Sequence, residues 1–433
     1  MIEGVLQHGN EAKVLWEAYQ WQVTSFVAMV GEIVERAAGT SGLFWATLLL
    51  HSVWRYNAVT YFGAKEEGKS MKIRGAVLYQ PKTRVVVEEV ELAEPREGEV
   101  LVKIVGAGVC HSDYHRVDGH SAIKTLPWLL GHEGSGIVEK VGPGVRSVAP
   151  GDHVIISIAP MCGKCRNCTL GRPNLCEGYP PNQRPGSTPE NTRITKGGKP
   201  IYHNYATYAE RTVVLEDNLV KVRKDVPLEK LCLIGCGVMT GVGAVINRAK
   251  VPVGASVAVW GCGGVGLNAI QGAVIAGAYP IIAVDTVARK LEFAQEMGAT
   301  HFVDASKEDP VARVKEITGG GADFTFDVVG SDKTLLQAFQ AIRDGGTCVM
   351  VGVPQQGAVL SINPGELFRD KGILGTFYGA GRPRVDFHWL IDLYLAGRLK
   401  LDELISKQRP LDEVNEAFED MVKGVVARTV LRP

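Results

Sequence analysis

The sequence predicts an α/β fold in two parts, an antiparallel, barrel-like β domain and a domain built on a doubly wound parallel sheet. Three observations lead to this prediction. The chain has 433 residues, which is long enough for two domains. Short β-branched runs separated by turns follow Met71. Beyond about Val253 the pattern changes to strand-like runs that alternate with helical stretches.

The composition is that of a packed globular protein. Hydrophobic residues make up 45% of the chain and charged residues 22%, which excludes a disordered chain. The 47 Lys and Arg residues balance 47 Asp and Glu residues, so no net field favours a phosphate backbone or an anionic bilayer. We therefore expect neither a nucleic-acid partner nor a membrane partner.

Residues 1–70 differ from the rest and carry no motif. The strongly apolar part of residues 37–54 is too short to cross a membrane. The acidic start fits neither a signal peptide nor a transit peptide. Two interpretations stay open, an accessory helical segment or an upstream stretch included by a misplaced start codon. We favour the second, because Met71 leads directly into a strand-like segment.

The β domain is predicted over residues 71–237. Its strands are expected at residues 74–78, 84–90, 99–104, 136–141 and 153–158. Residues 179–200 are rich in Pro, Gly, Asn and Lys, which predicts an exposed loop.

The parallel-sheet domain is predicted over residues 238–377. Its strands are expected at residues 256–260, 280–284, 301–303, 323–329 and 347–353, with helices between them. Residues 378–433 are expected to return to the first domain.

A glycine fingerprint joins the first strand of this series to a helix. The loop contains Gly261, Gly263, Gly264, Val265 and Gly266 in the G-x-G-x-x-G pattern. These glycines permit a tight turn, close approach of a pyrophosphate and close helix packing. Asp285 follows nineteen residues after Gly266, where a carboxylate accepts hydrogen bonds from a ribose diol and repels a 2′-phosphate. This pattern predicts NAD rather than NADP.

Four of the nine cysteines lie within fifteen residues. Cys162, Cys165, Cys168 and Cys176 have the spacing x2, x2, x7, which suits a closed tetrahedral zinc site with a structural role. An iron–sulfur cluster is the rival interpretation, but no Pro follows the last Cys and no second cluster motif exists. Clustered thiols without a secretory signal also favour a reducing compartment, so we expect a cytoplasmic protein.

The remaining metal-ligand candidates are dispersed. Cys110, His132 and Cys236 would provide two thiolates and an imidazole, which leaves one zinc position open as catalysis needs. Spacing alone cannot join residues so far apart, and each by itself reads equally well as a small buried thiol or a turn histidine.

These motifs together resemble the zinc-containing medium-chain alcohol dehydrogenases. The resemblance runs from Met71 to the end of the chain. It rests on residues 131–136, continued by residues 141–145, and on the order of the cysteine lobe and the glycine loop. It implies a GroES-like catalytic domain and a Rossmann domain. It also implies catalytic zinc on Cys110, His132 and Cys236, and structural zinc on Cys162, Cys165, Cys168 and Cys176.

The resemblance implies further roles around the catalytic zinc. Asp113 would orient His132, and Glu133 would lie behind the metal. Zinc would acidify the alcohol and hydride would pass to NAD, while Ser112 and then His115 would carry the proton away.

The resemblance also implies cofactor contacts outside the glycine loop. His111 and Arg428 would contact the pyrophosphate, and Lys290 or its neighbour Arg289 would contact the adenosine ribose. Val353, at the end of the last predicted strand, completes the cofactor set.

The sixty-residue separation of Cys176 and Cys236 resembles the longer-loop branch of the family, which implies a homodimer. That branch includes S-(hydroxymethyl)glutathione dehydrogenases, an alternative function. In those enzymes acidic residues and an Arg hold glutathione, whereas this chain has Ser121, Ala122, Ile123 and Lys124, then Glu177, Gly178 and Tyr179. Ile158 is expected to line the alcohol pocket where relatives often have an aromatic residue. A non-catalytic zinc and NAD-binding protein is the third interpretation, but all the expected catalytic residues are present.

Overall fold

A computed structural model describes residues 70–120, 125–180, 183–355 and 357–433. The predicted N-terminal extension therefore lies outside the described residues, apart from Ser70. The described residues all belong to one compact unit, which begins at Lys69.

The β domain contains two sheets. The first has the order β4-β1-β2-β7-β8, and comprises β1 (Ser70–Leu78), β2 (Val86–Ala93), β4 (Trp128–Leu129), β7 (Ile194–Lys196) and β8 (Lys199–Ile201). The second has the order β10-β6-β5-β3-β18-β17 with β9 also on β3, and comprises β3 (Glu99–Gly108), β5 (Glu133–Val141), β6 (His153–Ile156), β9 (Arg211–Leu215), β10 (Leu219–Val222), β17 (Ile405–Pro410) and β18 (Arg428–Arg432). All pairings are antiparallel except β17 with β18.

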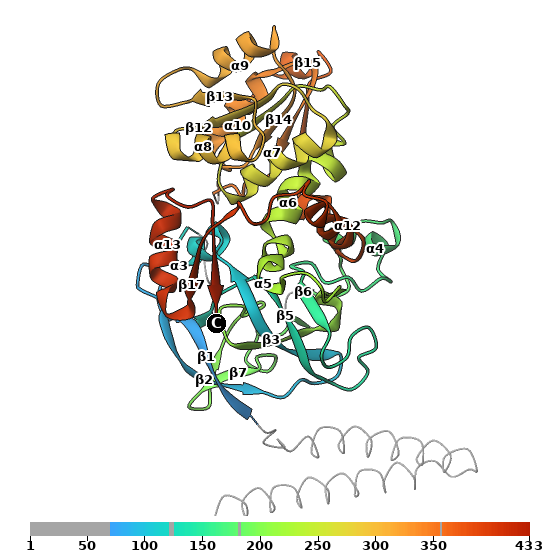
Figure 1. The fold of residues 1–433 in the computed structure, drawn as a ribbon, viewed down its shortest axis with the longest axis vertical. Coiled ribbons are helices and arrows are strands. Elements are labelled where there is room, and N and C mark those ends of the chain that lie inside the picture. The colour runs from blue at the N-terminus through green and yellow to red at the C-terminus, as the bar shows by residue number, and fades with distance from the viewer. Residues whose placement is uncertain (1–69, 121–124, 181–182, 356) are drawn as a thin grey trace, which may run out of the picture. The chain divides into compact units, whose positions relative to one another are not determined.

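The last strand of the chain closes onto the first half of the sequence. Val430 of β18 pairs with Gly108 of β3, and Gly108 also pairs with Glu133 of β5. In Figure 1 the red C-terminal segment accordingly lies among blue and cyan strands. The candidate site lies where β3, β5 and β18 meet.

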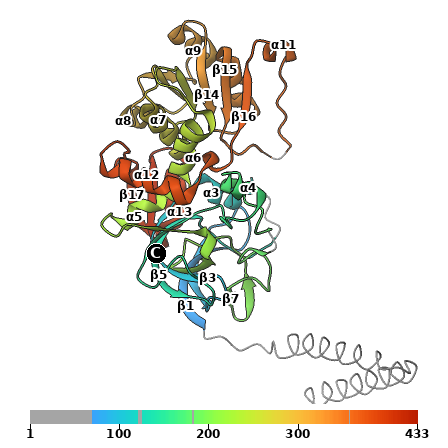
Figure 2. The same cartoon turned by 90° about the vertical axis from the view of Figure 1, so that its right-hand side faces the viewer.

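The third sheet is wholly parallel, with the order β13-β12-β11-β14-β15-β16. Figure 2 shows β14, β15 and β16 running side by side. The strands are β11 (Val257–Trp260), β12 (Ile281–Asp285), β13 (His301–Asp304), β14 (Ala322–Asp327), β15 (Ile342–Met350) and β16 (Gly372–Gly375). Because the order reverses beside β11, the loop that follows β11 lies where doubly wound sheets bind ligands.

Two of the helices between the parallel strands begin at side-chain caps. Asp309 accepts a hydrogen bond from the backbone of Val311 and precedes Pro310, and Ser331 accepts one from Thr334. The helices between the parallel strands are α7 (Gly264–Ala276), α8 (Ala288–Glu296), α9 (Pro310–Thr318) and α10 (Asp332–Gln340). The other helices are α3 (His111–Val117), α4 (Arg166–Thr169), α5 (Leu228–Leu231), α6 (Gly237–Gly243), α11 (Pro364–Leu367), α12 (Pro383–Leu395) and α13 (Val414–Val422).

The predicted fold class is confirmed, with two local corrections. The loop predicted over residues 179–200 is wrong at its C-terminal end, because β7 and β8 form a hairpin there and Ile194 is buried. The strand predicted to end at Val353 ends at Met350 instead. Val353 lies in the following loop and is 60% exposed.

Among the described residues, no single helix is long and apolar enough to cross a membrane. One bent pair, Leu228–Gly235 and Gly237–Ala249, meets that test of length and composition jointly, with a 52° bend between its halves.

A buried histidine in the β domain leads to a prediction on acid stability. His203 is fully buried, neither ring nitrogen has a partner among the described residues, and burial lowers its pKa to about 4. In the unfolded chain its pKa is near 6.5, so the unfolded state takes up a proton first as the pH falls. As the pH is lowered from 6.5 to 4, the free energy of unfolding should therefore fall by about 3 kcal/mol.

Urea unfolding of the wild type and of His203→Phe, followed across this pH range, checks the prediction. Phe should remove most of this pH-dependent loss, because it does not titrate. The same loss in both proteins would assign the acid sensitivity to other groups.

Candidate active site and zinc-binding lobe

The dispersed ligand candidates come together in the structure. Ligand atoms of Cys110, His132, Glu133 and Cys236 all lie within 4.8 Å of one another. Cys110 is the N-cap residue of α3, two residues after the end of β3, and His132 immediately precedes β5. Cys236 stands between a short 3₁₀ turn (Cys232–Gly235) and α6. The pairing of β3 with β5 therefore unites residues that the sequence keeps far apart.

The imidazole of His132 is oriented from behind by Asp113. His132 Nδ1 lies 2.8 Å from Asp113 Oδ2, and Asp113 also accepts hydrogen bonds from the Gly131 backbone and the Tyr208 hydroxyl. A proton on Nδ1 leaves the Nε2 lone pair free, and Nε2 is buried without a hydrogen-bond partner among the described residues. A hydrogen bond from Cys236, together with nearby His132 and Arg428, holds the pKa of the Cys110 thiol well below its usual range.

Two thiols and an unpartnered buried imidazole nitrogen are the donors that zinc takes at a catalytic site. The residues present therefore fit the metal that the sequence predicts.

Behind this cluster Glu133 forms a buried ion pair with Arg428. Burial raises the pKa of Glu133 to about 7, against the opposing effect of Arg428. Arg428 also reaches the glycine loop, since a Cβ on Gly264 would lie 2.3 Å from Arg428 Cδ. The structure thus places Arg428 between the ligand cluster and the start of α7.

The predicted proton carriers share helix α3. Ser112 is exposed at its first turn. His115 lies one turn later, with Nδ1 3.7 Å from Asp118 Oδ2 and its ring stacked on His120 at 4.4 Å between centroids. The ring of His111 lies 6.0 Å from that of His115. Sequence reasoning missed Asp118 and His120, because polar residues near a helix end carry no distinguishing pattern.

The glycine loop has the geometry that a dinucleotide needs. Gly261 has φ of +90°, and a Cβ on Gly266 would lie 1.8 Å from the Gly261 carbonyl oxygen. Nothing would obstruct a Cβ on Gly263, so open space faces the loop there.

Asp285 ends β12 and accepts backbone hydrogen bonds from Cys262 at 2.8 Å and Val287 at 3.0 Å. Lys290 on α8 lies near Gly424, where a Cβ would be 3.0 Å from Lys290 Cε. Val265 is partly buried at the start of α7. Because a side chain at Gly266 would fill the turn and open space faces Gly263, these residues fit NAD.

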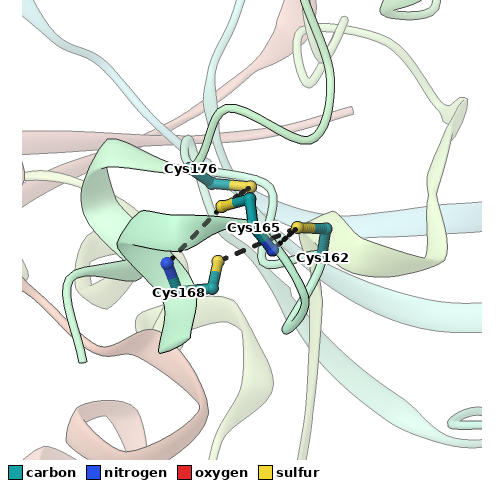
Figure 3. Close-up of side chains that lie close together, drawn as sticks. All are labelled: Cys162, Cys165, Cys168 and Cys176. Atoms are coloured by element: carbon teal, nitrogen blue, oxygen red, sulfur yellow. Dashed lines mark hydrogen bonds between the residues drawn. The ribbon is translucent and has the colours of Figure 1, made fainter. Parts of the chain in front are cut away.

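The four clustered cysteines converge from α4 and the chain on either side of it (Figure 3). The sulfur atoms of Cys162 and Cys168 lie 4.0 Å apart, and those of Cys165 and Cys176 lie 3.9 Å apart. Tetrahedral ligands at about 2.3 Å from zinc would be separated by about 3.8 Å. Backbone N–H groups of Cys168 and Glu177 donate to the Cys165 sulfur and lower its pKa to about 6. The lobe therefore fits structural zinc.

The structure describes only some of the residues at the two positions where relatives hold glutathione. Residues 121–124 lie outside the described residues. Glu177 accepts a hydrogen bond from Asn167, and the Tyr179 hydroxyl donates to Asp217. These two side chains are therefore engaged around the cysteine lobe. Ile158 is partly buried, and its carbonyl accepts a 2.5 Å hydrogen bond from Tyr205.

Two family models match the chain. An alcohol dehydrogenase GroES-like domain matches residues 96–224, and a zinc-binding dehydrogenase model matches residues 264–396.

Curated relatives cover most of the chain. The S-(hydroxymethyl)glutathione dehydrogenase of Saccharomyces cerevisiae is 40% identical over 375 residues, which are 84% of this chain and 97% of that protein. The class-3 alcohol dehydrogenase of Cereibacter sphaeroides is 40% identical over 374 residues, 83% of this chain and 100% of that protein.

A solved structure agrees with this relationship. The benzyl alcohol dehydrogenase of Acinetobacter calcoaceticus superposes with a TM-score of 0.78 at 36% identity, covering 84% of this chain and 99% of that one. On these matches, and on the two donor sets and the glycine loop, the chain belongs to the zinc-containing medium-chain alcohol dehydrogenase family.

Proposed function

We propose that this chain oxidises a primary or secondary alcohol to an aldehyde or ketone with NAD, at the cluster of Cys110, His132 and Cys236. These three residues would hold catalytic zinc, and the four-cysteine lobe would hold structural zinc. The observation that carries the proposal is the unpartnered Nε2 of His132, which lies in a cluster whose ligand atoms are all within 4.8 Å of one another.

When bound, zinc supplies a Lewis acid that acidifies an alcohol hydroxyl, and NAD supplies a hydride acceptor. Asp113 Oδ2 would hold the proton of His132 on Nδ1 and keep Nε2 available. Ser112 Oγ would receive the alcohol proton, and the His115 ring would pass it toward solvent. Glu133 would balance the buried charge of Arg428 behind the cluster.

The cofactor would lie across the carboxyl ends of β11 and β12. Backbone groups of residues 261–266 would approach the pyrophosphate, joined by His111 and Arg428. The Asp285 carboxylate keeps acceptor capacity beyond its two backbone partners, and this would receive the ribose hydroxyls beside Lys290. Val353, exposed in the loop after β15, would flank the nicotinamide half.

Absorbance at 340 nm tests this function directly. Purified protein with NAD and a panel of primary, secondary and aromatic alcohols should produce NADH, and chelator treatment should abolish the rate. NADP should be a poorer acceptor because Asp285 repels its 2′-phosphate. Metal-independent turnover, or no turnover while zinc and NAD are bound, would contradict the proposal.

A second candidate is oxidation of S-(hydroxymethyl)glutathione, the activity named for the Saccharomyces cerevisiae relative. The 40% identity over most of both chains favours it. Adding formaldehyde with glutathione to the same assay separates the two functions, because only the second requires the adduct.

We also propose that the chain divides into a catalytic domain (71–237), a Rossmann domain (238–377) and a C-terminal segment (378–433) that returns to the catalytic domain.

We propose further that the protein is a cytoplasmic homodimer without nucleic-acid or membrane partners. The edge strand β16 supports self-association, since the preceding segment exposes Val359 and Phe368, the latter by 92%. Sedimentation velocity measures the oligomeric state.

A further inference from the structure

Arg116 on α3 is a partly buried cation that forms no ion pair with any described carboxylate. Its guanidinium lies 4.3 Å from the centroid of the Trp128 ring. Arg211 and Arg428, of comparable or greater burial, pair with Glu139 and Glu133. The partly buried Arg184 has no ion pair either, but its guanidinium donates to the Tyr179 carbonyl. Burial lowers the pKa of Arg116, and the nearby carboxylate of Asp113 opposes that shift without forming an ion pair. A guanidinium held against an indole in this way keeps N–H donors for a planar, negatively charged group.

The place of Arg116 on the helix directs it toward the reaction centre. Ser112 lies four residues earlier, so the two side chains are neighbours on one face of α3. Asp113, which holds His132, lies three residues earlier on an adjoining part of that face. Trp128 belongs to β4, which ends two residues before Gly131. Arg116 therefore stands one helical turn from the proposed proton acceptor.

Tyr205 is hydrogen-bonded beside the expected alcohol pocket. Its hydroxyl donates to the carbonyl of Ile158, the residue expected to line the alcohol pocket.

We propose that Arg116 binds a carboxylate of the substrate, so that the preferred alcohol or aldehyde carries an anionic group a few bonds from its reacting carbon. The inference rests on the proposed alcohol oxidation and specifies its substrate class. The guanidinium of Arg116 would form two parallel charge-assisted hydrogen bonds with the substrate carboxylate, a geometry that Lys cannot reproduce. Binding of the carboxylate would also hold the reacting hydroxyl of the substrate beside Ser112.

A matched substrate pair tests the proposal. Rates are measured with 4-(hydroxymethyl)benzoate and with 4-methylbenzyl alcohol, which has the same shape but no charge. The variants are Arg116→Gln and Arg116→Lys, with Arg313→Gln as a control, because Arg313 is also partly buried but pairs with Glu316 on α9. Calorimetric binding of 4-(hydroxymethyl)benzoate to each protein gives a readout that does not depend on turnover.

The wild type should prefer the carboxylate substrate in kcat/KM by about ten- to a hundredfold, the range expected for hydrogen bonds between charged groups. Arg116→Gln should lose that preference mainly through KM, Arg116→Lys should keep part of it, and Arg313→Gln should keep all of it. The preference is the ratio of the two substrates within each protein, so any general effect of a substitution on the reaction cancels from it.

Equal rates for the two substrates in the wild type, or an unchanged preference in Arg116→Gln, would overturn the proposal while alcohol oxidation stands. If the wild type oxidised neither substrate, alcohol oxidation would be in doubt. Binding that weakens tenfold in Arg116→Gln would then still support the carboxylate site, and equal binding would overturn it. S-(hydroxymethyl)glutathione, assayed beside the pair, shows whether the carboxylate belongs to a hydroxy acid or to the peptide.

Discussion

Replacing Cys236 by Ser is expected to lower NAD-dependent alcohol oxidation by at least about a thousandfold and to release one zinc equivalent per chain. The thiol belongs to a buried set whose ligand atoms lie within 4.8 Å of one another, and His132 Nε2 has no other partner among the described residues. A serine hydroxyl ionises far less readily than a thiol and is a poor replacement ligand. NADH formation and zinc content by mass spectrometry measure the two effects.

The chain offers a matched control four residues earlier. Cys232 is also buried, but its thiol donates to the Glu229 carbonyl and lies outside the ligand set. Cys232→Ser should keep both zinc equivalents and most of the activity, since a hydroxyl can make the same hydrogen bond. Full zinc content and near-normal turnover in Cys236→Ser would remove that residue from the proposed catalytic site.

Replacing Cys168 by Ser is expected to release the other zinc equivalent and to destabilise the protein by about 3 kcal/mol or more. This is a fraction of the roughly 10–16 kcal/mol by which zinc stabilises small structural sites. The cysteine lobe is also hydrogen-bonded to other segments of the chain. Asn174, within the lobe, donates to the Phe377 carbonyl, and Tyr179, just after it, donates to Asp217. Loosening the lobe should therefore lower stability beyond the local segment.

Urea unfolding with parallel zinc analysis checks this second expectation. The neighbouring Thr169→Ala serves as the control, since Thr169 is exposed and outside the ligand set, and its effect should stay near about 0.5 kcal/mol. Cys168→Ser with unchanged zinc content and an unchanged urea midpoint would mean that the lobe needs no metal.

Features defined by short spacing were predicted most completely. The glycine loop spans six residues and the cysteine lobe fifteen, so a local turn or helix determines their geometry. Strand positions were predicted to within a few residues where β-branched runs are bounded by turns. The end of β15 was misplaced because the apolar run continues past Met350, after the pairing with β16 stops.

Several residues of the site had no sequence signal of their own. His120 and Asp118 follow α3 as ordinary polar residues, and only stacking and proximity to His115 distinguish them. Arg116 reads in the sequence as one more surface cation, and its contact with Trp128 depends on where β4 lies. His203 is fully buried in a region whose neighbouring sequence reads as a loop.

The sequence by itself determined the α/β class, the cysteine lobe and the nucleotide-binding loop, because each depends on interactions between near neighbours along the chain. Only the tertiary structure brought Cys110, His132 and Cys236 together, and only it paired Glu133 with Arg428 across nearly three hundred residues. Such long-range contacts arise from strand pairing and burial, in which β3 must meet both β5 and β18. Sequence spacing carries no record of that geometry, so the reaction centre had to be found in the fold.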